Sequence, residues 1–231
     1  MPTRREVVRL DRANKGLVAA ARRELFALVS LLPSDPDARL RELVEAFRAL
    51  VTAYGDAGLA VVQEWIADTA PRSVEPQVGP AVSDAAIVSV VSEVLQRPEA
   101  QTPEGVARLL RGPLQRMVLQ PGREAAKETA VKFGGRWARV PTRANPCAFC
   151  VVLASLGSWY KSSDTAGGEG YEDRYHDDCY CVATPIWTEG DYPDGYDPEA
   201  LYKLYSAASS DVGSTYMRKV AARMRQLYGM R

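Results

Sequence analysis

The sequence of 231 residues contains only one histidine and four cysteines, and it has no long hydrophobic run. A membrane-spanning helix needs about 20 consecutive apolar residues, a length that no stretch of this chain approaches. The first residues, Met1–Glu6, lead into no apolar segment, so a secretory signal peptide is not expected. Basic and acidic side chains number 29 each, which removes the simplest argument for nucleic-acid binding. These absences predict a globular chain with no membrane partner.

Motifs of common catalytic sites are also absent. The chain has no H-E-x-x-H, no G-x-S-x-G and no phosphate-binding G-x-x-x-x-G-K-[ST] sequence. The single imidazole, His176, is the only histidine that could act as a general base. A nucleophilic mechanism would therefore pair His176 with Ser155, Ser158 or a cysteine, and only if His176 is not a metal ligand.

The composition that is present is that of a folded protein. Hydrophobic residues make up 46% of the chain and charged residues 25%, which is typical of globular domains. The length suits one domain or two small ones, and it is enough to bury a core without disulfide bonds. The expected fold class is α+β and mainly α.

A helical domain is predicted over residues 1–132. Apolar residues recur at spacings of three and four over 22–29 and 40–54, as in amphipathic helices. Pro33 and Pro36 separate these two helices. Gly55 and Gly58 mark a turn or a weak point in the second.

The second half of this domain follows a proline-rich connector at 71–80. A helix is expected over 84–96, and Thr102, followed by Pro103, is placed to cap another helix. The sequence predicts that this helix, 104–118, is interrupted near Gly112–Pro113. A separate helix then covers 121–132.

After residue 132 the composition changes. A loop-rich module is predicted over 133–197, and a C-terminal helical tail over 198–231. The module is expected to contain short strands at 136–140 and 180–186 and a short helix at 148–156. Tail helices are expected from Pro198 and over 215–228.

The neutral net charge is a sum of blocks of opposite sign. Residues 103–146 hold nine basic and three acidic residues (+6), residues 164–211 hold two basic and twelve acidic residues (−10), and residues 212–231 hold five basic residues and no acid. Such blocks indicate solvated faces with intramolecular pairing, or contacts with different partners, including DNA phosphates. Four aromatic residues are expected to pack beside the cysteine region rather than stack on bases: Trp137, Trp159, Tyr160 and Tyr175.

The cysteines and the histidine all lie within one short window. Cys147 and Cys150 form a C-x2-C pair, and His176, Cys179 and Cys181 form an H-x2-C-x-C sequence 25 residues further on. Two such turns can supply a tetrahedral structural zinc site. Since five ligands compete for four positions, the most economical set is Cys147, Cys150, His176 and Cys179, with Cys181 as a spare or a substitute for the histidine.

Other interpretations of the cluster remain open at this point. Two disulfides, free buried thiols or a catalytic cysteine are each compatible with the spacing, whereas a redox pair lacks the expected βαβ setting. A metal ion would fix the ends of the loop at 157–175, which is rich in glycine and serine.

The stretch 136–187 combines this cluster with Arg136-Trp137, Leu156-Gly157 and Pro185. It resembles the Mu F-like minor head proteins of tailed bacteriophages, in the version found in phages of actinobacteria. The motif residues of that family match Cys147, Cys150, His176, Cys179 and Cys181 in this sequence.

The resemblance implies a minor capsid or head-morphogenesis protein, and the absence of a catalytic motif favours a structural role that is not catalytic. Such a protein is part of the virion head or procapsid, is present in the host cytoplasm during assembly, and associates with the portal or the major capsid protein. Two alternatives stay open: a capsid maturation protease, and an internal head protein that contacts packaged DNA through its basic segments.

Overall fold

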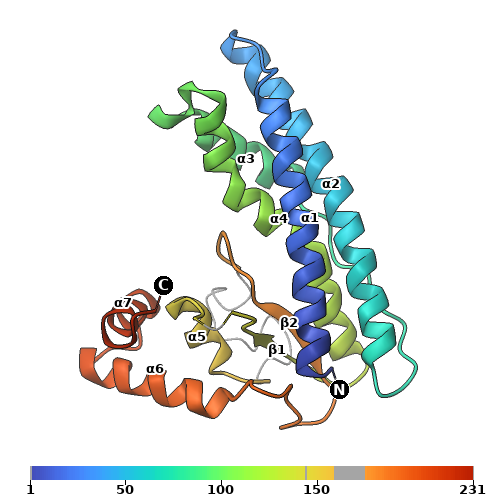
Figure 1. Cartoon of the computed structure of the whole chain (residues 1–231), viewed down its shortest axis with the longest axis vertical. Helices are drawn as coiled ribbons and strands as arrows, with labels where there is room; N and C mark the ends of the chain where they lie inside the picture. The colour runs from blue at the N-terminus through green and yellow to red at the C-terminus, as the bar shows by residue number, and fades with distance from the viewer. Residues whose placement is uncertain (1, 144, 159–174, 231) are drawn as a thin grey trace.

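A computed structural model describes residues 2–143, 145–158 and 175–230. The described chain is mainly helical with one small sheet, so the expected α+β, mainly α class is confirmed. Four helices form an elongated bundle (Figure 1). They are α1 (Arg4–Val29), α2 (Pro36–Thr69), α3 (Asp84–Leu95) and α4 (Pro103–Lys132), with the short 3-10 helix η1 (Pro98–Gln101) before α4.

The break between α1 and α2 falls where the prolines predict it, and Asp35 caps α2 by accepting a hydrogen bond from the Ala38 amide at 2.8 Å. Helix α2 continues through Gly55 and Gly58, so the predicted turn is wrong. A Cβ on Gly58 would lie 3.5 Å from the Val118 carbonyl oxygen. The glycines are therefore contact points between α2 and α4 rather than turn residues.

Helix α4 is a single helix of 30 residues, so the predicted interruption near Gly112–Pro113 and the separate helix at 121–132 are wrong. Pro113 and Pro121 lie inside it, and each removes one backbone hydrogen bond. Helices α1, α2 and α3 and both strands pack against α4, and this burial offsets the local cost. Thr102 caps the helix as expected, with its hydroxyl accepting from the Gly105 amide at 3.1 Å.

Two apolar clusters fill the interior. The first lies within the bundle and includes Phe47, Leu43, Leu110 and Leu114. The second lies at the base of the bundle and joins α1, α2 and α4 to the sheet, through residues such as Trp65, Ile66, Trp137 and Ile186. The prediction that Trp137 is buried is confirmed, and it packs in the second cluster, at the base of the bundle.

The sheet consists of β1 (Arg136–Val140) and β2 (Val182–Ile186), which pair antiparallel with Arg136 opposite Ile186 and Val140 opposite Val182. The first strand is confirmed. The second begins two residues later than expected, because Tyr180 and Cys181 belong to the turn that carries the cysteine ligands. The sheet lies against α4 and so places that turn beside the middle of the bundle.

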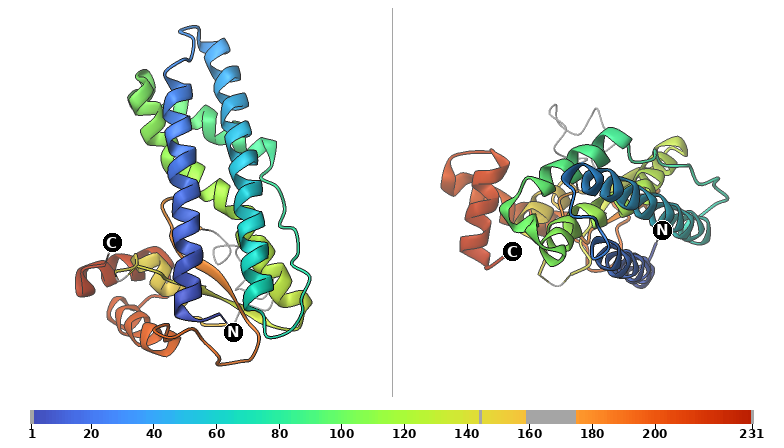
Figure 2. Two further views of the ribbon diagram at one scale, coloured as in Figure 1. Left: turned by 45° about the vertical axis from the view of Figure 1, so that its right-hand side comes forward. Right: turned by 90° about the horizontal axis from the view of Figure 1, so that it is seen from above.

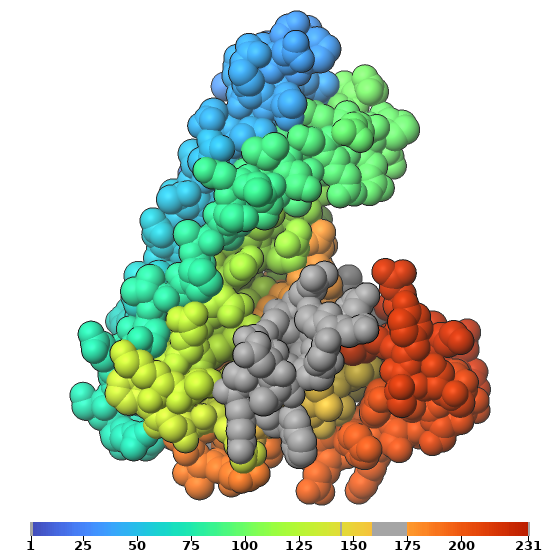
Figure 3. Space-filling model, turned by 180° about the vertical axis from the view of Figure 1, so that it is seen from behind, coloured from blue at the N-terminus to red at the C-terminus, as the bar shows by residue number. Residues whose placement is uncertain are grey.

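Three further helices stand beside the base of the bundle (Figure 2). They are α5 (Ala148–Ala154), α6 (Pro198–Val212) and α7 (Met217–Tyr228), and α7 packs against both α5 and α6. Figure 3 shows from behind that α6 and α7 form a lateral arm. The domain limits at 132 and 197 stay a prediction. None of the helices in the described part of the chain carries an apolar stretch that would reach across a bilayer.

Candidate metal centre

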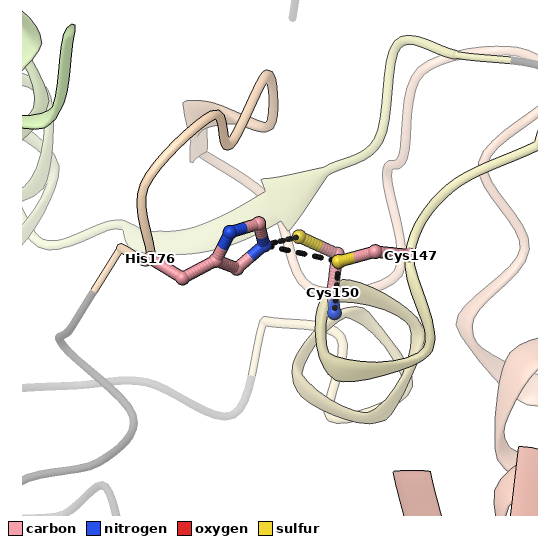
Figure 4. A group of neighbouring side chains, drawn as sticks. All are labelled: Cys147, Cys150 and His176. Atoms are coloured by element: carbon pink, nitrogen blue, oxygen red, sulfur yellow. Dashed lines mark hydrogen bonds between the residues drawn. The ribbon is translucent and has the colours of Figure 1, made fainter. Parts of the chain in front are cut away.

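The C-x2-C pair is carried by the first turn of α5. Cys147 is the residue that caps this helix, and its sulfur accepts a hydrogen bond from the Cys150 amide at 3.3 Å. Both thiols therefore lie at the same end of α5, facing His176 (Figure 4). We call Cys147 and Cys150 the α5 half-site.

His176, Cys179 and Cys181 form the second group of ligands, which we call the knuckle half-site. The His176 Nε2 atom lies 3.0 Å from the Cys147 sulfur and 3.3 Å from the Cys150 sulfur. The Cys150 and Cys179 sulfurs are 3.5 Å apart, and the ligand atoms of Cys150, Cys179 and Cys181 all lie within 4.8 Å of one another. The structure thus brings all five predicted residues together, with Cys150 at the centre.

The imidazole is oriented for metal binding. Its Nδ1 atom lies 2.6 Å from the backbone carbonyl of Asp177, so Nδ1 donates a proton there. This hydrogen bond makes Nε2 the ring atom that faces the sulfurs, as in metal-bound histidines with a carbonyl partner, and a metal bound there would replace the Nε2 proton. The edge of the ring also packs against Phe149 at a centroid distance of 5.5 Å.

Side chains of α4 hold the backbone of the knuckle half-site. Gln115 and Arg123 both donate hydrogen bonds to the Cys179 carbonyl, at 2.8 and 2.9 Å. Arg22 of α1 donates to the Gln115 side chain at 2.8 Å and to the Asp178 carboxylate at 2.7 Å. The bundle therefore positions this half-site through polar contacts that need no metal.

The same turn also packs closely on the surface of α4. A Cβ on Gly112 would lie 2.7 Å from the Cβ of Asp177, so no larger residue fits there without a shift. The Asp177 carboxylate pairs with Arg116 at 2.9 Å. Asp178 has a φ of 59°, the left-handed conformation that aspartate tolerates better than most residues. Gly112 is thus required for close approach.

Buried cations lie directly behind the cysteines. Arg139 is fully buried, and its guanidinium lies over the Tyr175 ring at 3.8 Å from the centroid, while the Arg123 guanidinium lies 3.7 Å from the same centroid. Burial lowers the pKa of Arg139, but the neighbouring Tyr175 and the thiolates, Cys179 foremost, raise it above its ordinary value. The prediction that Tyr175 packs beside the site is confirmed. Hydrogen bonds from Cys150 and Cys181, together with the charge of Arg123, lower the pKa of Cys179, whereas hydrogen bonds among the cysteines and burial raise the pKa of Cys150 and of Cys181.

Hydrogen bonds within the cluster shift the pKa values of the cysteines and of the histidine. The hydrogen bond from Cys150 lowers the pKa of Cys147 to about 4, and the hydrogen bond and charge of His176 add to this effect. Burial lowers the pKa of His176, but hydrogen bonds to Cys147 and Cys179 outweigh it and raise the pKa to about 10. Cysteine binds metals as the thiolate, so the environment already favours the ligand form of Cys147.

A pocket of about 270 Å³ leads to the site and is lined by both half-sites together with Thr142 and Arg143. Cys147 is partly exposed towards it, whereas Cys150, Cys179 and Cys181 are buried. An ion can therefore reach the cluster from the Cys147 side.

The donor set fits a soft or borderline divalent ion. Thiolates with one imidazole are the ligands of structural zinc. All four cysteines are free, and the 3.5 Å between the Cys150 and Cys179 sulfurs far exceeds a disulfide bond. Which four of the five residues bind stays a prediction.

The serines considered as nucleophiles lie elsewhere. Ser155 donates to the Val152 carbonyl at 2.7 Å, and the Ser158 hydroxyl lies 3.0 Å from the hydroxyl of Tyr192. Neither contacts His176, whose Nε2 faces Cys147 and Cys150. Among the described residues, the thiols of Cys147 and Cys150 lie within hydrogen-bond distance of His176 Nε2, and a nucleophile–base pair there does not account for Cys179 and Cys181 in the same cluster.

Sequence reasoning missed the residues that support the site. Arg22, Gly112 and Gln115 carry no motif, and Arg123 and Arg139 entered only as charges in the basic block 103–146. The structure uses much of that block internally. Its basic residues with an acidic partner or a buried position are Arg111, Arg116, Arg123, Lys127, Arg136 and Arg139. The predicted residues Trp159 and Tyr160, and most of the loop 157–175, lie outside the described residues.

Comparison with models of known protein families identifies the family of this chain. The model of the VG15 protein family matches residues 1–208, which is most of the sequence. The chain belongs to the VG15 protein family. This is a viral family of phage proteins, and its match spans the whole bundle, the metal centre and most of α6. Neither the search of curated proteins nor the search of solved structures found a match.

Proposed function

We propose that this protein is a minor capsid or head-morphogenesis protein of a tailed bacteriophage, with a structural role and a structural zinc ion. One observation carries the proposal: a chain of a phage family gathers four cysteines and its only histidine at one point between α4 and α5. The resemblance of the segment 136–187 to Mu F-like minor head proteins supports the finer assignment.

The position of the cluster supports a structural role for the metal. The α5 half-site belongs to a unit of α5, α6 and α7, which has its own small apolar cluster. The knuckle half-site is held by Gln115 and Arg123 of the bundle. An ion bound to both half-sites would crosslink the two units, as structural zinc does in small domains with little core of their own.

The partners under this proposal are the portal and the major capsid protein, and the location is the phage head or procapsid, with the host cytoplasm during assembly. Family membership and the resemblance support this assignment. Fractionation of procapsids tests it: the protein should sediment with portal-containing particles and should appear in the proteome of purified virions. Its absence from both would contradict the proposal.

The metal is tested separately by elemental analysis of protein purified without a histidine tag. About one zinc per chain is expected if one tetrahedral centre forms. Absence of zinc together with four titratable thiols would contradict a zinc site.

A second candidate, a capsid maturation protease, is favoured by one observation: the 3.0 Å between the Cys147 sulfur and His176 Nε2 beside an open pocket. The His176→Ala variant, checked for folding by circular dichroism, decides the matter when cleavage of the capsid protein is assayed. Unchanged cleavage removes His176 from any mechanism, and loss of cleavage with the fold retained favours the protease.

A further inference from the structure

The first three turns of α1 contain an unusual concentration of arginine. Arg4, Arg5, Arg9 and Arg12 lie within nine residues, and at 100° per residue they occupy one side of the helix. This end of the molecule is the base of the bundle, where the N-terminus lies (Figure 1). We call these four residues the α1 arginine face.

The positions of these arginines are unfavourable for the stability of the isolated helix. Arg5 and Arg9 are four residues apart and Arg9 and Arg12 are three apart, so like charges are neighbours on the surface and destabilise the helix by about 0.2–0.5 kcal/mol per pair. Cations are also unfavourable at the positive N-terminal end of the helix dipole. Glu6 and the Thr3 capping box compensate only in the first turn. Such conflicts with local preference are expected at functional sites.

The arginines are also largely free of intramolecular anions. Among the described residues Arg5 and Arg12 have no ion pair, and Arg9 reaches only Asp68 at 3.7 Å, with both side chains more than half exposed. Arg4 donates to the Pro141 carbonyl at 2.8 Å. The basic residues that surround the metal centre are, in contrast, mostly paired or buried, so the α1 arginine face is a distinct surface.

A hollow of about 630 Å³ lies against this face. Its lining residues are Thr3, Arg4, Arg5, Val8, Arg9, Arg12 and Asp194. Among the described residues that line it, one carboxylate faces four guanidinium groups, and Val8, which is half-buried, is the one aliphatic residue. Much of the lining surface is therefore the aliphatic stems of the arginines, with the charged guanidinium groups at their ends.

We propose that the α1 arginine face binds the phosphate backbone of a nucleic acid. The guanidinium fork matches phosphate in a bidentate geometry, and a nucleic acid backbone offers several phosphates to the four arginines at once. Protein interfaces are usually anchored by Trp and Tyr as well as by Arg, and no aromatic residue is among the described residues that line this face. The chemistry therefore favours a polyanion contacted without base readout over a protein partner. The inference goes beyond the proposed structural role and does not depend on the metal.

The test is the binding of full-length protein to a fluorescent duplex of about 20 base pairs, measured by anisotropy at several salt concentrations. The variant is Arg5→Gln/Arg9→Gln/Arg12→Gln, with Arg4 kept because it contacts Pro141. The matched control is Arg23→Gln/Arg41→Gln/Arg108→Gln, three exposed arginines away from this face, with the same change in net charge.

The first variant should bind at least about tenfold more weakly at low salt. Its log–log salt dependence should be shallower by about 2–3, because each phosphate contact contributes about 0.9. The control variant should bind like the wild type. The melting temperature of the first variant should stay equal or rise, since unfavourable like charges are removed.

Four outcomes would overturn the proposal. They are no binding by the wild-type protein at low salt, equal binding by the wild type and the first variant, an equal loss in the control variant, and equally good competition by polyglutamate per unit charge. The last result would assign the face to an acidic protein partner instead.

Discussion

The bundle and the Cys/His module are stabilised in different ways. The bundle has a continuous cluster of buried aliphatic side chains and Phe47, contributed by α1, α2, α3 and α4. Around the metal centre, the corresponding cluster consists, among the residues that the structure describes, of Tyr175 and three buried cysteines, with Cys147 at its edge. Apolar burial can therefore hold the bundle together, whereas this part of the module needs bonds of another kind.

Helix α4 is the element that serves both regions. It contributes Leu110 and Leu114 to the bundle core, and it presents Gly112, Gln115 and Arg123 to the knuckle half-site. The comparison of the two regions indicates that the two half-sites differ in their support. Residues of α4 hold the knuckle half-site in place without a metal, whereas the α5 half-site lacks such polar contacts with α4 among the described residues. The knuckle half-site is built on the bundle, while the α5 half-site sits on a helix that contacts β1 and reaches the apolar cluster at the base of the bundle through Ala154, and a bound ion would add a further link between the two half-sites.

The largest expected effect comes from Cys150→Ser, because Cys150 belongs to both groups of close ligand atoms. Bound zinc should fall from about one per chain to none, since structural zinc sites depend on each thiolate. The helical circular dichroism of the bundle should persist, while hydrogen exchange in α5 and α7 accelerates.

The matched control for this prediction is Cys181→Ser, which changes the residue left over in the most economical ligand set. It should retain zinc, with affinity reduced less than in Cys150→Ser. If the two variants lose zinc equally, Cys181 is a ligand and the set has to be reassigned. If the bundle unfolds with the metal, the contrast between the two regions is wrong.

The opposite perturbation is Phe47→Ala in the bundle core, where the side chain is fully buried. Large-to-small changes of this kind cost about 3–5 kcal/mol, because they remove buried apolar surface and leave a cavity. Chemical denaturation should show this loss of stability. Zinc per chain should stay near the wild-type value in the folded protein, and a loss of zinc in parallel would mean that the centre depends on bundle packing.

The sequence predicted the elements that depend on local signals. The C-x2-C and H-x2-C-x-C spacing identified all five residues of the cluster, and Thr102 and Pro198 marked the starts of two helices. These features are visible within a few residues of the chain. They do not require knowledge of what packs against them.

The errors arise where tertiary contacts override local preference. Pro113 and Pro121 indicate helix ends, yet α4 continues because neighbours on several sides bury it. Gly58 indicates a turn, yet it permits the close approach of α2 to the Val118 carbonyl. The supporting role of Gln115 was equally invisible, because it depends on a residue 64 positions away along the chain.

A smaller effect is expected for Gly112→Ala, at the contact between α4 and the knuckle half-site. The added methyl group would meet the Asp177 side chain at 2.7 Å, and overpacking of this kind costs about 1–3 kcal/mol. Zinc affinity, measured by chelator competition, should fall because His176 adjoins Asp177.

The control for this prediction is Gly16→Ala in α1. Nothing lies within 4 Å of a Cβ at this position, so helix propensity alone should stabilise the protein by up to about 1 kcal/mol. Equal effects of both variants would argue against a tight contact at Gly112.

The smallest expected effect is that of Arg22→Met, which removes the link from α1 to Gln115 and Asp178. The loss should be about 1 kcal/mol, because the Asp178 side chain is 45% exposed and water replaces part of the interaction. In the cobalt-substituted protein, the ligand-field spectrum should keep its shape while cobalt binds more weakly, since Arg22 supports a ligand backbone and touches no ligand atom.

The control is Arg97→Met, which removes an exposed pair with Glu93. It should change the stability by no more than about 0.5 kcal/mol, and it should leave the cobalt affinity unchanged. If Arg22→Met and Arg97→Met behave alike, the bundle does not position the knuckle half-site through α1, and Gln115 and Arg123 of α4 do so alone.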